Sequence, residues 1–139
     1  MKFMIKYLFN DYRRNIYKNV IKEVKEFIKN EIGKKRTVKI KIFGSFISQK
    51  EKPNDLDILV IIKNYTEDFS DVGELFLETL ELKSGAQLTI VENNIYGKKV
   101  ENDILKEGKN RYGKNYKLID ITNILVWYYD KVYKDYRTS

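Results

Sequence analysis

A nearly unbroken apolar run at residues 56–62 constrains the fold of this chain more than any other segment. Such a run is typical of a strand that is buried on both faces at the centre of a sheet. Upstream, Val38, Ile40 and Ile42 alternate with lysines, which predicts a second strand with one covered face. The two segments therefore predict a sheet against which the rest of the chain must pack.

The segment before these strands has the periodicity of an amphipathic helix. Its apolar residues recur at intervals of three and four, and lysines occupy the other faces. Gly33 is a natural stop, so we expect this helix over about residues 12–32. Residues 87–91 predict a further strand. The pattern predicts an α/β (α+β) fold, in which a small mixed sheet is flanked by helices.

Two more helices are expected in the second half of the chain. Ser70 could cap one of them, with an outward acidic face and an end at Gly85. The other is short and runs from about Lys98 to Glu107, where Gly108 would end it.

The C-terminal segment, about residues 119–136, is open between a helix and a strand. Residues 124–129 are apolar or aromatic all round, so a helix there should be buried on more than one side. The segment would either cover the sheet or pack on a partner, which could be a second copy of the chain.

Two carboxylates stand at the start of the central apolar run. Asp55 and Asp57 are two residues apart, and in an extended chain this spacing puts both side chains on one face. Because neighbouring carboxylates repel each other, the pair favours a cation that neutralises both. Such oxygen ligands suit Mg²⁺, which usually takes one or two protein carboxylates and leaves its other positions to water and substrate phosphates.

A glycine–serine turn precedes this pair. Gly44 lets the backbone come close to a ligand, and Ser45 adds a hydroxyl at an expected helix start. The turn and the two aspartates could together hold a nucleoside triphosphate. The alternative is that Asp55 merely belongs to a turn that caps the buried strand. Asp57 fits that alternative poorly, because an unpaired carboxylate inside an apolar strand costs free energy.

Composition narrows the chemistry that is open to the chain. Neither cysteine nor histidine occurs among its 139 residues, which excludes disulfides, zinc–thiolate sites and serine–histidine triads. An enzyme of this composition must use carboxylates, lysine, tyrosine or a hard metal ion, which favours the Mg²⁺ interpretation. The start of the chain lacks a signal-peptide core and no apolar run is long enough for a membrane span, so we expect a cytoplasmic protein with no membrane partner.

The net charge of +7 is unevenly spread along the chain. Acidic residues gather in residues 64–96, whereas the two ends are basic. A polyanion such as nucleic acid or ATP would be attracted to the basic parts. Lysines on solvated helix faces explain the same charge without a ligand, so charge alone does not favour nucleic-acid binding.

The Gly44-Ser45 turn followed by Asp55-x-Asp57 resembles the signature of the polymerase-β-type nucleotidyltransferases. The resemblance is closest to their minimal members, which include the antitoxins of HEPN/MNT toxin–antitoxin pairs. Residues 103–112 resemble a helix-end segment that many of those minimal proteins contain. The resemblance implies one nucleotidyltransferase-like domain over residues 1–139, with the catalytic fold at about 37–112.

The resemblance also implies a Mg²⁺-dependent enzyme. Asp55 and Asp57 would hold the metal ion, and Gly44 and Ser45 would cradle the terminal phosphates of ATP or another triphosphate. A nucleoside monophosphate, AMP by analogy, would pass to a hydroxyl acceptor. The family suggests a tyrosine of a HEPN-type partner toxin as that acceptor.

One position departs from the family pattern. Polymerase-β-type enzymes usually carry a third carboxylate on the next strand, and the aligned residue here is Gln87, an amide that cannot act as a base. This leaves a second hypothesis, a catalytically degenerate protein of the same fold that binds a nucleotide or masks a partner. A basic nucleic-acid-binding module is a third, although no motif of a known nucleic-acid reader occurs.

Overall fold

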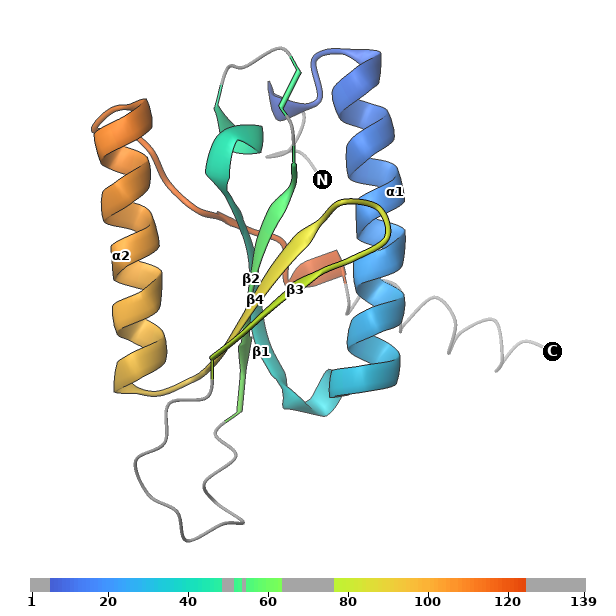
Figure 1. Cartoon of the computed structure of the whole chain (residues 1–139), viewed down its shortest axis with the longest axis vertical. Helices are drawn as coiled ribbons and strands as arrows, with labels where there is room; N and C mark the ends of the chain where they lie inside the picture. The colour runs from blue at the N-terminus through green and yellow to red at the C-terminus, as the bar shows by residue number, and fades with distance from the viewer. Residues whose placement is uncertain (1–5, 49–51, 54, 64–76, 125–139) are drawn as a thin grey trace, which may run out of the picture.

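The computed structural model describes residues 6–48, 52–53, 55–63 and 77–124. These residues form an α+β structure with two α-helices and a five-stranded mixed sheet, and Figure 1 shows the sheet between the two helices. The strands, in sheet order, are β3 (Leu77–Glu81), β4 (Gln87–Glu92), β2 (Asp57–Ile62), β1 (Thr37–Phe43) and β5 (Ile119–Asp120). Only β2 and β4 run parallel, and the other neighbouring pairs are antiparallel.

The aspartate strand β2 occupies the middle of the sheet, as the apolar run predicts. Every residue of β2 after Asp57 is buried, because β1 and β4 flank the strand and a helix covers each face. The register places Phe43 of β1 and Gln87 of β4 on either side of Asp57. The strands expected at residues 38–42 and 87–91 are likewise confirmed.

Helix α1 (Asp11–Phe27) covers one face of the sheet. The Asn10 side chain caps its first turn by accepting a hydrogen bond from the Arg13 N–H at 2.8 Å. A π-helical turn, Ile28–Ile32, continues it to Gly33, whose φ of 97° ends the helix. The helix expected over about residues 12–32 is thus confirmed.

The prediction of a helix that ends at Gly85 is wrong where the structure describes it. Residues Leu77–Glu81 form strand β3, and Gly85, with φ of 89°, lies in the hairpin turn that joins β3 to β4. Leu80 packs against the main core, and the ladder with β4 satisfies the backbone groups. These tertiary contacts outweigh the helical spacing of the side chains. The expected helix start at Ser70 lies outside the described residues.

Helix α2 (Ile95–Tyr112) covers the other face of the sheet and is longer than the expected helix at about residues 98–107. It continues through Gly108 and ends at Gly113, whose φ is 111°. A Cβ on Gly108 would lie 1.9 Å from Cε1 of Tyr116. This glycine therefore makes room for an aromatic ring and does not stop the helix.

Only the first part of the C-terminal segment, up to residue 124, is described. Its strand β5 pairs with β1 at the edge of the sheet, and Ile121 and Ile124 are buried in the core. The choice between helix and strand for the later residues lies outside the described part of the chain. Neither helix in the described part has an apolar stretch long enough to cross a membrane.

Candidate functional site

The glycine–serine turn and the second aspartate lie against each other. Gly44 follows β1 directly and opens a 3-10 turn, Gly44–Ile47, with φ of 79°. A Cβ at this position would lie 2.2 Å from Oδ2 of Asp57. Only glycine fits here without displacing the carboxylate, so the close approach that Gly44 permits is first of all to Asp57.

The carboxylate of Asp57 is half-buried on the α2 face of the sheet. Burial, with a contribution from the charge of Asp55, raises the pKa of Asp57 from 3.8 to about 6. Within the described residues, no hydrogen bond or ion pair reaches this carboxylate. A cation placed beside it would stabilise its ionised form, and the charge of exposed Asp55 would add to the attraction for that cation.

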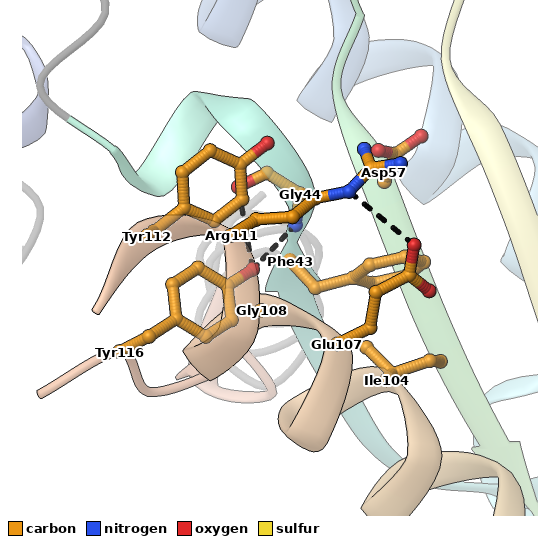
Figure 2. A pocket seen from close by; sticks show the side chains of 9 residues that line it. All are labelled: Phe43, Gly44, Asp57, Ile104, Glu107, Gly108, Arg111, Tyr112 and Tyr116. Carbon is orange, nitrogen blue, oxygen red and sulfur yellow. Dashed lines mark hydrogen bonds and ion pairs between the residues drawn. The ribbon is translucent and has the colours of Figure 1, made fainter. Parts of the chain in front are cut away.

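A small cavity of about 110 Å³ lies over Asp57, between the Gly44 turn and the C-terminal half of α2 (Figure 2). Glu107 and Arg111 of α2 line it together with the rings of Tyr112 and Tyr116. The Arg111 Nε lies 3.5 Å from Oε1 of Glu107, so the acid of the same helix partly neutralises this guanidinium.

Tyr116 closes the cavity next to the glycine turn. Its hydroxyl accepts a hydrogen bond from the Gly44 N–H at 2.6 Å and donates one to the Gly44 carbonyl oxygen at 3.3 Å (Figure 2). Burial raises the pKa of Tyr116 to about 12, so this hydroxyl keeps its proton at physiological pH. The resemblance implies that Gly44 binds phosphate, but its N–H already donates a hydrogen bond to the Tyr116 hydroxyl.

Sequence reasoning missed Tyr116 as part of this site. The signal that could have pointed to it is Gly108, a glycine inside a helix that is well formed on both sides. A glycine in such a position usually has a packing reason, and here that reason is the ring of Tyr116.

Arg13 fixes the far end of the glycine–serine turn and was also missed. The side chain is fully buried, and its guanidinium donates to the carbonyl oxygens of Tyr7 (2.7 Å), Ser48 (2.9 Å) and Phe46. It also lies 4.6 Å from the centre of the Phe46 ring. Arg13 thus anchors the backbone that follows Ser45. In the sequence it resembles one more base on a lysine-rich helix, although it shares the face of the buried Val20 and Val24.

Gln87 lies beside Asp57 on the parallel neighbour β4, which is the strand on which the resemblance implies a third carboxylate. Its side chain is exposed. Among the described residues, no three acidic side chains gather in a way that could hold a metal ion. The carboxylates that line the cavity are Asp57 and Glu107, and Glu107 is paired with Arg111, whereas Asp55 is not part of the lining. Mg²⁺ usually takes one or two protein carboxylates when substrate phosphates and water supply the remaining ligands.

Ser45 belongs to a different cavity from Gly44 and Asp57. It lines a larger space of about 640 Å³, and Tyr112 and Tyr116 form a wall common to both cavities. The structure thus brings Gly44 and Asp57 together and places Ser45 on the other side of the two tyrosines.

The mixed sheet between two helices, with a half-buried carboxylate against a glycine turn, defines an α+β protein with a candidate cation site. The chain belongs to a family of unknown function, DUF6932, which matches residues 2–127. No curated protein and no solved structure matches it. The chemistry of the site therefore carries the functional proposal.

Proposed function

We propose that this protein is a minimal nucleotidyltransferase of the polymerase-β type. It would transfer a nucleoside monophosphate, which is AMP when the substrate is ATP, from a triphosphate to a hydroxyl acceptor. The observation that carries the proposal is the contact between Gly44 and Asp57, because it joins the two parts of the sequence signature in space. The strand order also supports it, since the turn follows β1, Asp57 begins the adjacent β2 and Asp55 comes two residues before it.

Asp55 and Asp57 are the residues that would hold Mg²⁺. The raised pKa of Asp57 fits this role, because no ion pair among the described residues compensates its ionised form, and the nearby Arg111 is paired with Glu107. When bound, the ion would neutralise the phosphate charge that develops as pyrophosphate leaves. Gln87 is placed to add a neutral amide oxygen from the neighbouring strand.

The other residues of the site would hold the glycine–serine turn in position and would take no part in acid–base chemistry. Tyr116 and Arg13 hold the two ends of the Gly44–Ile47 turn, so the turn is fixed before any ligand arrives. A fixed turn beside an aspartate that holds a cation can align the reacting phosphate without a loss of conformational entropy at the moment of reaction. The acceptor that we propose is a tyrosine hydroxyl of a partner protein, as in the HEPN/MNT pairs that the sequence resembles.

A catalytically degenerate binding protein of the same fold is the second candidate. Gln87 favours it, because this amide stands beside Asp57 where a third carboxylate is expected. The described residues supply no replacement for that carboxylate. Such a protein would bind a partner or a nucleotide without transferring anything.

The test is incubation with ATP labelled on the α-phosphate, Mg²⁺ and candidate helical toxin partners. The transferase predicts label on a partner hydroxyl, which is lost in Asp55→Asn and in Asp57→Asn. Asp11→Asn is the matched control, because this exposed aspartate of α1 lines neither cavity. ATP labelled on the γ-phosphate should leave no label, since pyrophosphate departs.

The other candidates predict different results in the same experiment. A degenerate binding protein gives no label, and both aspartate variants still form the partner complex. A nucleic-acid-binding module instead gives salt-sensitive binding to nucleic acid that neither substitution changes. Either result would overturn the transferase proposal.

A further inference from the structure

The cavity over Asp57 is too small to hold a nucleotide. Its volume is about 110 Å³, whereas small-molecule sites generally measure about 300–1,000 Å³. The neighbouring cavity on the far side of Tyr112 and Tyr116 measures about 640 Å³ and lies within that range. If a nucleotide binds next to Asp57, most of its volume must therefore lie in the larger cavity.

The residues that line the larger cavity suit an anionic ligand. Lys6 and Lys117 line it, and none of the described residues that line it is acidic. Ser45 and Asn115 add neutral hydrogen-bonding groups. A cavity with two cations and no carboxylate favours a polyanionic ligand such as a phosphate chain.

Two aromatic rings form the wall between the cavities. Tyr112 and Tyr116 stack with their centroids 5.3 Å apart and an interplanar angle of 27°. Tyr116 is buried, whereas Tyr112 remains 40% exposed. The outer ring is thus rigidly supported and still accessible, which is what stacking against a nucleobase requires.

The bond between Tyr116 and Gly44 also argues that phosphate is recognised in the larger cavity. Because the Gly44 N–H already donates to the Tyr116 hydroxyl, it is not available to a phosphate oxygen unless that bond breaks. The other described groups that could bind phosphate are Arg111, which lines the smaller cavity and is paired with Glu107, and the Ser45 hydroxyl, the Asn115 amide and the two lysines, which line the larger cavity.

We propose that this lysine–tyrosine cavity, defined by Lys6, Ser45, Tyr112, Asn115 and Lys117, is the nucleotide-binding site of the protein. The lysines and Ser45 bind the phosphate chain, and Tyr112 stacks on the base. The small cavity over Asp57 is left for the reacting phosphate and the cation. The choice of a nucleoside triphosphate as ligand rests on the proposed function, whereas the position of the site rests on the cavity itself.

The test measures binding to the full-length chain by calorimetry in the presence of EDTA, so that the aspartate pair is not needed. The three probes are ATP, inorganic tripolyphosphate and adenosine. Lys117→Glu should weaken ATP and tripolyphosphate by about tenfold or more, because a cation becomes an anion beside the phosphates. Lys114→Glu is the matched control, since this exposed lysine makes the same change in net charge three residues away but lines neither cavity.

Variants at Tyr112 distinguish binding of the base from binding of the phosphates. Tyr112→Leu should weaken ATP and adenosine by about tenfold and leave tripolyphosphate unchanged, because only the first two carry a base. Tyr112→Phe keeps the ring and should bind all three probes like the parent chain. This second variant excludes a general loss of structure as the cause, and thermal unfolding of each variant checks the same point.

The possible results separate this inference from the proposed function. If Lys117→Glu and Lys114→Glu have equal effects, or if the parent chain does not bind ATP, the inference is overturned. If Asp57→Asn abolishes label transfer while Lys117→Glu and Tyr112→Leu leave KM for ATP unchanged, the transferase proposal stands and the inference fails. If ATP binding depends on Lys117 but no label is transferred, the inference stands and the transferase proposal fails.

Discussion

The two faces of the sheet bury different amounts of apolar surface. Toward α1 lies the larger cluster, in which Ile40, Ile58 and Val60 have no exposed surface. Toward α2, the separate cluster has only three buried members among the described residues, Leu59, Ile61 and Val91. Asp57 and Gln87 also belong to this second face, because side chains alternate along paired strands.

This difference indicates how the fold divides stability from chemistry. Burial of apolar side chains toward α1 supplies most of the favourable free energy, so the α2 face can hold polar groups that cost free energy. The raised pKa of Asp57 is one such cost. Four comparisons test this division, beginning with the one that should have the largest effect.

Truncation of matched isoleucines compares the two faces directly. Ile58→Ala on the α1 side should reduce the free energy of unfolding by about 3–4 kcal/mol, because it leaves a cavity in a closely packed core. Ile104→Ala, on the partly buried α2 side, should cost only about 1 kcal/mol. Urea unfolding measures both, and equal losses would contradict the division.

The contact between Gly44 and Asp57 should give the next largest effect. Gly44→Ala combines an unfavourable φ with a clash against Asp57 and should cost about 2–3 kcal/mol. Gly33→Ala is the control, because its φ of 97° is also unfavourable but nothing lies within 4 Å of the added Cβ. It should cost only about 1 kcal/mol.

The difference between these two glycines should depend on the carboxylate. In an Asp57→Ala background, Gly44→Ala should cost only slightly more than Gly33→Ala does, since Oδ2 and Cγ are then absent and only the Cβ at position 57 remains, at 3.3 Å. If the extra cost persists in that background, the clash with Asp57 is not its cause.

Asp57→Asn should stabilise the metal-free protein at pH 7. Ionisation of Asp57 costs free energy in the folded state, because its pKa is about 6 there against an ordinary value of 3.8. The full shift overstates the gain for a carboxylate that is partly exposed to solvent, so we expect about 1–2 kcal/mol. The parent chain should therefore lose stability relative to the variant as the pH rises from about 4 to about 6.

Thermal unfolding at several pH values checks this expectation. Below about pH 4 the parent and the variant should have similar stability, because Asp57 is protonated in both the folded and the unfolded state. Mg²⁺ with ATP should raise the melting temperature of the parent chain more than that of the variant, which keeps the lysine–tyrosine cavity but loses one of the two carboxylates that would hold the cation. A variant that is less stable than the parent at pH 7 would contradict the conclusion that burial makes the ionised carboxylate of Asp57 unfavourable in the folded state.

The smallest effect is expected at the ion pair that joins α2 to the sheet. Lys41 of β1 pairs with Glu101 of α2, and both side chains are partly buried. A double-mutant cycle with Lys41→Met and Glu101→Gln should give a coupling energy of about 0.5–1 kcal/mol. A coupling energy larger than the loss of unfolding free energy in Ile58→Ala would mean that charge contributes most to holding α2 against the sheet.

The central part of the fold could be predicted from the sequence because its signals are local. The apolar run of residues 56–62 and the alternation before it depend on a few neighbouring residues, and both strands are where they were expected. The region that ends at Gly85 shows where local signals fail. Leu77–Glu81 pairs with β4 across a hairpin, and that pairing outweighs the helical spacing of its side chains.

The candidate site likewise has a part that could be predicted from the sequence and a part that could not. The neighbourhood of Gly44 and Asp57 was predictable, because both residues flank adjacent strands. The roles of Arg13 and Tyr116 were not, since each acts on the turn from a distant part of the sequence. The position of Ser45 in a second cavity depends on where α2 and the segment after it pack, which no sequence spacing specifies.

The central claim is that Asp55 and Asp57 hold a divalent cation beside the glycine turn. The most direct measurement is paramagnetic broadening of backbone amide signals by Mn²⁺, a substitute for Mg²⁺, in the presence of ATP. The account predicts that broadening is strongest at Gly44 and at its neighbours Asp57 and Gln87, which pair in the sheet, and that Asp57→Asn removes it from these amides. Broadening that is centred elsewhere, or that persists unchanged in Asp57→Asn, would contradict the claim.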